Sequence, residues 1–106
     1  MKYPRSSPWG RVQSQRSICK GILAVSTAGH GGFYVSPSRL AELSNNVRYA
    51  KRHNSPGSWY EEDCEAYIVM VAFPEVCNAL GIDRDRAMEG LTRWYPEIAE
   101  ALATTA

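Results

Sequence analysis

The stretch ICKGILAVSTAGHGGFYV, residues 18–35, decides the fold. Residues 18–26 form a β-branched apolar run, residues 29–32 are a glycine-rich breaker around His30, and residues 33–35 form a second short run. This order predicts two strands joined by a tight turn, and weak alternation over residues 11–15 adds a third. We therefore expect a small antiparallel sheet of two or three strands in the N-terminal third.

The rest of the sequence favours helices. Ser36 is a good N-cap and Pro37 suits the first helical position, while the acids of residues 61–63 precede a strongly apolar segment. We expect helices over residues 36–44, 61–73, 75–80, 83–95 and 97–102. A strand over residues 66–73 is the alternative, because several of its residues are β-branched. The whole is an α+β fold in which three or four helices pack on the sheet.

Length and composition indicate one globular domain over residues 1–106. The chain has 106 residues, of which 44% are hydrophobic and 22% charged, so a wholly disordered chain is excluded. We expect frayed ends at residues 1–7 and 103–106. Residues 45–58 are polar and basic, and they predict a long loop.

The compartment is inferred from what the sequence lacks. No apolar run approaches the ~20 residues of a membrane span, and no apolar core of a signal peptide follows the first residues. Cys19, Cys64 and Cys77 are widely spaced with no CxxC pair, which indicates free thiols rather than a zinc site. We expect a cytoplasmic protein without metal or cofactor.

Charge is divided unevenly along the chain, although the formal net charge is only +1. Residues 1–53 carry nine Lys and Arg against one acid, a net +8, whereas residues 54–106 carry three Arg against ten acids, a net −7. Such asymmetry indicates a charged partner, or two halves that fold against each other and neutralise internally. Both interpretations stay open.

The segment STAGHGG, residues 26–32, is the first candidate for chemistry. Glycines on both sides of His30 bring the backbone close to a ligand, and a backbone nest there could receive an anion. The spacing matches neither a P-loop nor a dinucleotide fingerprint. The alternative is a tight hairpin turn that carries an incidental histidine.

The segment WYEEDC, residues 59–64, is the second candidate. Its consecutive carboxylates, Glu61, Glu62 and Asp63, could tune one another as a base or present an acidic surface. Trp59 and Tyr60 beside them look like interface anchors. The alternatives are acids that dress a helix start and aromatics that pack in the core. The adjacent carboxylates make Cys64 a poor nucleophile, although a Cys64–His30 dyad stays open.

The third candidate is the basic stretch of Arg48, Lys51 and Arg52, interleaved with Tyr49. Cations beside an aromatic ring on a loop suit phosphate contact and base stacking. A solvated loop without a ligand is the alternative interpretation.

Several of these segments occur together in one order. They are PWG at residues 8–10, TAGHGGF at 27–33, SPSRL at 36–40, WYEEDC at 59–64, AFP at 72–74 and WYP at 94–96. In this combination the chain resembles a domain of unknown function carried by phages, plasmids and other bacterial mobile elements. It departs from that pattern at Ala66, where the family has an aromatic residue.

The resemblance implies a genomic setting more than an activity. Small stand-alone proteins of such elements are often antagonists of host defence, anti-CRISPR proteins among them. On this basis we expect a cytoplasmic protein of a bacterial host that binds a defence complex, plausibly a CRISPR effector, and blocks nucleic-acid engagement. The contact residues would be Trp59, Tyr60, Glu61, Glu62 and Asp63, with His30 nearby.

Two other functions stay open, and neither fixes an oligomeric state. One is a small enzyme or ligand-binding domain that uses His30 with Glu61, Glu62 or Asp63 as its carboxylate partner. The other is a nucleic-acid-binding accessory protein that uses the basic N-terminal half, with Arg48, Lys51 and Arg52 as contacts. We expect a binding protein rather than an enzyme.

Overall fold

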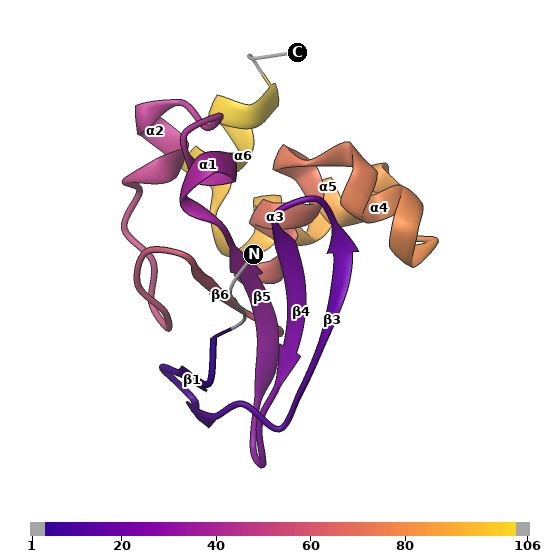
Figure 1. Cartoon of the computed structure of the whole chain (residues 1–106). Helices are drawn as coiled ribbons and strands as arrows, with labels where there is room; N and C mark the ends of the chain where they lie inside the picture. Colours follow the sequence, from indigo (N-terminus) through magenta and orange to yellow (C-terminus); the bar gives the residue numbers. More distant parts are fainter. Residues whose placement is uncertain (1–3, 104–106) are drawn as a thin grey trace.

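The structure, a computed structural model, describes residues 4–103 and has an α+β architecture (Figure 1). A four-stranded antiparallel sheet, in the order β3-β4-β5-β6, stands beside a two-stranded β1-β2 hairpin. In chain order the elements are β1 Ser6–Ser7, β2 Gly10–Arg11, β3 Ser14–Cys19, β4 Ile22–Ser26, β5 Gly31–Val35, α1 Pro37–Leu40, α2 Asn45–Arg48, β6 Trp59–Glu61, α3 Ala66–Ala72, α4 Pro74–Leu80, α5 Arg84–Trp94 and α6 Pro96–Ala103. The predicted fold class is confirmed.

The sheet has more strands than the sequence predicted. The apolar run over residues 18–26 is a hairpin rather than one strand, because Gly21 adopts a left-handed conformation with φ +79° and turns the chain between β3 and β4. The fourth strand, β6, comes from outside the N-terminal third and pairs with β5. Strand pairing between distant segments leaves little trace in local sequence.

Three expected segments also change. The helix expected over residues 61–73 begins only at Ala66, because Glu61 belongs to β6. The helix expected over residues 36–44 ends at Leu40, and the expected loop over residues 45–58 begins with the short helix α2.

The ends at which fraying is expected are described only in part. Residues 1–3 and 104–106 lie outside the described residues. Ser6–Ser7 form strand β1, and Ala103 is the last residue of α6. Fraying of the ends stays a prediction.

The later helices follow their local signals. Asp83 caps α5, its side chain accepting a hydrogen bond from the Asp85 N–H at 2.9 Å. Gly81, at φ +67°, closes α4 in the left-handed conformation. Pro74 and Pro96 each open a helix, as proline favours.

The main core lies between the sheet and the helices. Ile22, Phe33 and Val35 point to the helical side, where α3 packs on β5 and β6 and α4 packs on β3. The opposite face carries an aromatic cluster. Trp59 meets Trp9 edge-on with ring centroids 5.6 Å apart and lies 4.9 Å from Tyr34.

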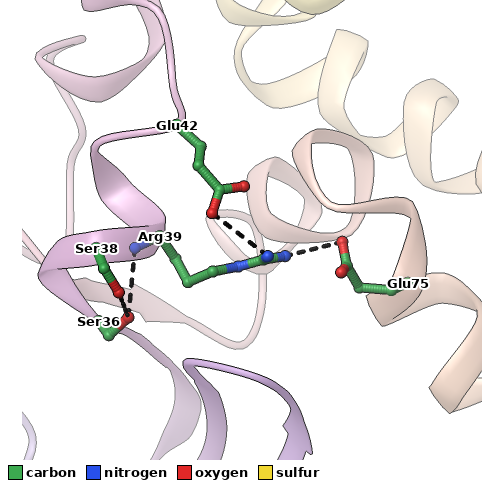
Figure 2. A network of polar contacts seen from close by, with 5 residues as sticks. All are labelled: Ser36, Ser38, Arg39, Glu42 and Glu75. Atoms are coloured by element: carbon green, nitrogen blue, oxygen red, sulfur yellow. Dashed lines mark hydrogen bonds and ion pairs between the residues drawn. The ribbon is translucent and has the colours of Figure 1, made fainter.

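Arg39 connects α1 to α4, as Figure 2 shows. Its Nη2 lies 2.8 Å from Glu75 Oε1 and its Nη1 lies 3.4 Å from Glu42 Oε2. The guanidinium also sits 4.6 Å from the centre of the Phe73 ring. Since the Arg39 side chain is only 14% exposed, these partners hold a cation that is largely withdrawn from water.

Gly32 is a point of close approach between β5 and β6, and it generates a stability prediction. A Cβ there would lie against the Tyr60 carbonyl, 2.6 Å from the Trp9 ring and 2.9 Å from the Glu61 Cα. Because two of these neighbours are backbone of β6, Gly32→Ala should lower the free energy of unfolding by about 1–3 kcal/mol.

Gly29→Ala is the matched control. A Cβ at Gly29 meets nothing within 4 Å, and its φ is not in the left-handed region. Urea unfolding should show a change within about 0.5 kcal/mol for this variant. Equal stability of the two variants would contradict the close approach at Gly32.

Candidate functional site

The β5–β6 pairing brings the two predicted motifs together. In register, Gly32 lies opposite Glu61, Phe33 opposite Tyr60, and the Glu62 N–H donates to the Gly31 carbonyl at 3.0 Å. HGG and WYEEDC, about 30 residues apart in sequence, therefore form one continuous region at the edge of the sheet.

The glycines of HGG make room for protein neighbours. A Cβ at Gly31 would lie 2.7 Å from Glu62 Oε2, whereas a Cβ at Gly32 points to the opposite face, toward Trp9. Both spaces that the missing side chains leave are thus filled by the protein. The role of these glycines is to let Glu62 and Trp9 lie close against the strand.

His30 lies at the tip of the β4–β5 hairpin. Thr27 closes the turn, because its hydroxyl donates to the His30 carbonyl at 2.9 Å and accepts from the His30 N–H at 3.2 Å. The imidazole is exposed. Across residues 4–103 no hydrogen bond or ion pair joins this imidazole to Glu61, Glu62 or Asp63.

Glu61 is a buried carboxylate that holds the turn between β6 and α3. Its Oε1 accepts from the Cys64 N–H at 2.7 Å and the Glu65 N–H at 3.3 Å, and its Oε2 accepts from the Asp63 N–H at 2.9 Å. Burial alone raises the pKa of the Glu61 carboxyl, but these backbone donors and the Cys64 thiol outweigh burial and lower the pKa to about 2. Glu61 is therefore an ionised structural group.

Glu65 is a residue of this region that the sequence analysis did not single out. It is fully buried, although it follows the WYEEDC segment directly in the sequence. Its Oε2 accepts from the Asn54 N–H at 2.8 Å and the Tyr95 hydroxyl at 3.3 Å. Its helical spacing to Ile68, three residues on, could have placed it on the buried face.

Cys64 is sealed inside the same cluster. Its thiol donates to Glu61 Oε1 at 3.0 Å and accepts from Asn54 Nδ2 at 3.5 Å. Burial, and then the bond to the ionised Glu61, raise the pKa of the thiol to about 11. With a protonated thiol and an exposed His30 on the hairpin tip, the structure does not assemble the Cys64–His30 dyad.

The predicted contact cluster divides into buried and accessible members. Tyr60 and Glu61 are 1% and 6% exposed, so they belong to the interior. Glu62 and Asp63 are exposed, and Trp59 is half-buried under Trp9. Contact with a partner stays a prediction for the accessible members.

The predicted basic contacts divide in the same way. Arg52 donates to the carbonyls of Trp59 at 2.6 Å and Gly57 at 2.7 Å, and its guanidinium lies 3.9 Å from the centre of the Tyr60 ring. It fastens the loop to β6. Arg48 is half-buried and Lys51 is exposed.

Neither a metal site nor a membrane-spanning helix is found among residues 4–103. No group of three or more His, Cys, Asp or Glu side chains is placed to hold a metal ion there. None of the helices in that range has the length and apolar content required to cross a bilayer.

The Glu61 carboxylate generates a pH-dependent stability prediction. Its pKa falls from 4.5 unfolded to about 2 folded, so its stabilisation is fully present above pH 4.5 and is lost as pH falls through 2. The shift corresponds to about 3 kcal/mol. Glu61→Gln should lose most of it at neutral pH, and its stability should fall less than that of the wild type between about pH 7 and about pH 3.

Urea unfolding at both pH values checks this, with Glu62→Gln as the matched control, because Glu62 is exposed. The control should follow the wild type. If Glu61→Gln also follows the wild type at both pH values, Glu61 does not hold the turn as a carboxylate.

Comparison with known proteins gives a family and no activity. No curated protein and no solved structure matches the chain. Residues 2–106 match a family described as a domain of unknown function, DUF7007. The match covers the HGG and WYEEDC motifs and the helices that follow them. The chain therefore belongs to the DUF7007 family.

Proposed function

We propose that the protein is a stoichiometric binding protein of a phage or other mobile element. It acts in the cytoplasm of a bacterial host, where it occupies the nucleic-acid-binding surface of a defence effector such as a CRISPR complex. The contact surface is the acidic corner, defined here as the exposed Glu62 and Asp63 and the neighbouring exposed His30. The resemblance to mobile-element proteins supports the setting.

The observation that carries this proposal is that two of the four neighbouring acids are buried and two are exposed. Two of the carboxylates, Glu61 and Glu65, are buried and accept hydrogen bonds from neighbouring backbone N–H groups. Glu62 and Asp63, at the same turn, are left exposed. A rigid turn that presents two adjacent negative charges suits a basic channel that otherwise binds phosphates.

Ligand binding is a second candidate, favoured by a small cavity beside Glu62. The cavity measures about 220 Å³ and is lined by Phe33, Ala66, Met70 and Leu80. A single carboxylate at an apolar cavity suits a small amine with an apolar body. Sub-stoichiometric inhibition of a defence effector would favour this candidate or an enzyme over the binding protein.

The test is charge reversal of the two exposed acids, Glu62→Lys with Asp63→Lys. The matched control is Glu97→Lys with Glu100→Lys on α6, which makes the same charge change at exposed positions. A tagged protein is used to capture partners from a bacterial lysate, and the recovered defence effector is then assayed for target binding with purified components. The acidic-corner variant should weaken inhibition at least about tenfold while the control leaves it unchanged.

Circular dichroism establishes that both double variants are folded. A folded acidic-corner variant that still inhibits fully would overturn the proposed surface. Capture that yields no defence effector would overturn the proposed target.

A further inference from the structure

The loop after α2 bounds a second cavity, on a part of the protein that the acidic corner does not use. It measures about 580 Å³ and lies beside Leu40 of α1. Its polar and aromatic lining includes Arg48, Tyr49, Arg52, His53 and Ser55. We call it the basic cavity.

The residues that line the basic cavity carry a net positive charge. Two guanidiniums and one imidazole line it, and no acidic side chain among residues 4–103 does so. Arg48 forms no ion pair within those residues, since the ion pairs there belong to Arg39. Glu65, which accepts from the N–H of the cavity-lining Asn54, is fully buried and does not line the cavity. The cavity therefore favours an anionic ligand.

A buried hydroxyl group without a partner lies at the same place. Ser55 is 8% exposed, lines the cavity, and its Oγ has no hydrogen-bond partner among the described residues. A buried polar group that stays unpaired costs about 1–3 kcal/mol, so an acceptor supplied by a ligand would be favourable.

An exposed aromatic ring stands at the edge of the cavity. Tyr49 is 69% exposed, one of two large hydrophobic side chains among the described residues with such exposure. The Arg48 guanidinium lies 5.1 Å from the centre of its ring. A flat exposed ring beside a cation offers stacking to a base whose phosphate pairs with the cation.

We propose that the basic cavity binds a nucleotide unit, with Arg48 and the Ser55 hydroxyl on its phosphate and Tyr49 stacked on its base. Arg52 is a positioning residue, because its guanidinium already donates to the Trp59 and Gly57 carbonyls. Lys51 lies apart, in the groove beside Trp94. The unit can be a free nucleotide or part of a single strand, since the phosphate and base chemistry is the same.

The test measures binding of two probes to the full chain. Fluorescence anisotropy follows a labelled oligothymidylate of about ten nucleotides, and calorimetry follows adenosine monophosphate. Arg48→Gln and Tyr49→Ala should each lower about tenfold the affinity for the probe that binds. Ser55→Ala should lower the affinity less. Arg86→Gln, an exposed arginine of α5, is the matched control and should leave binding unchanged.

The arms distinguish the two sources of the unit. Binding of the monophosphate with no gain from the strand identifies a free nucleotide, whereas tight strand binding that the monophosphate does not compete identifies a strand. Failure of both probes to bind would overturn the proposal, as would equal losses for Arg48→Gln and Arg86→Gln, which indicate non-specific charge attraction. Neither result bears on the acidic corner, because Glu62 and Asp63 are unchanged throughout.

Discussion

The Glu61 carboxylate holds the point where the sheet passes into the helices. Three backbone N–H groups of the following turn converge on it, from Asp63, Cys64 and Glu65. A charged acceptor gives stronger hydrogen bonds than a neutral one, and burial removes competing water. The turn fixes the entry of α3, and Glu65 at its end carries the loop and Tyr95 with it. The direction of α3 and the position of the loop both depend on this one ionised group.

The same arrangement separates structural from accessible chemistry. A carboxylate that accepts several N–H bonds has a low pKa and a weak tendency to take up a proton, so Glu61 is a poor general base. The thiol beside it is held protonated. WYEEDC looks catalytic in sequence because it contains several reactive residue types. In the fold, Glu61 and Cys64 have a structural role, because they hydrogen-bond to each other and to the backbone of the turn. What it offers to a partner is the remainder, Glu62 and Asp63.

The sequence predicted best those elements that are determined by residues close to one another in the chain, such as the later helices. The helices expected over residues 75–80 and 83–95 correspond to α4 and α5, because caps such as Asp83 and stops such as Gly81 act within a few residues. The strand Trp59–Glu61 was not predicted, since it exists through pairing with β5. Three acids before an apolar segment are typical of a helix start, and here tertiary pairing prevailed over that tendency. Of the predicted site, the joining of HGG to WYEEDC required the fold, because it depends on the pairing of β5 with β6.

The loop over residues 49–58 shows why a long connection can still form a defined surface. Its backbone is fastened at several points: the His53 N–H donates to the Tyr95 hydroxyl at 3.2 Å, the Asn54 N–H donates to Glu65, and Arg52 grips the chain at Gly57. The walls of the basic cavity are therefore formed before a ligand binds. Binding then loses little of the conformational entropy that ordering a free loop of this length would cost. Through the bond from Asn54, Glu65 connects this loop to the turn that Glu61 holds. The exposed acids of that turn and the walls of the basic cavity therefore both depend on the short segment between β6 and α3.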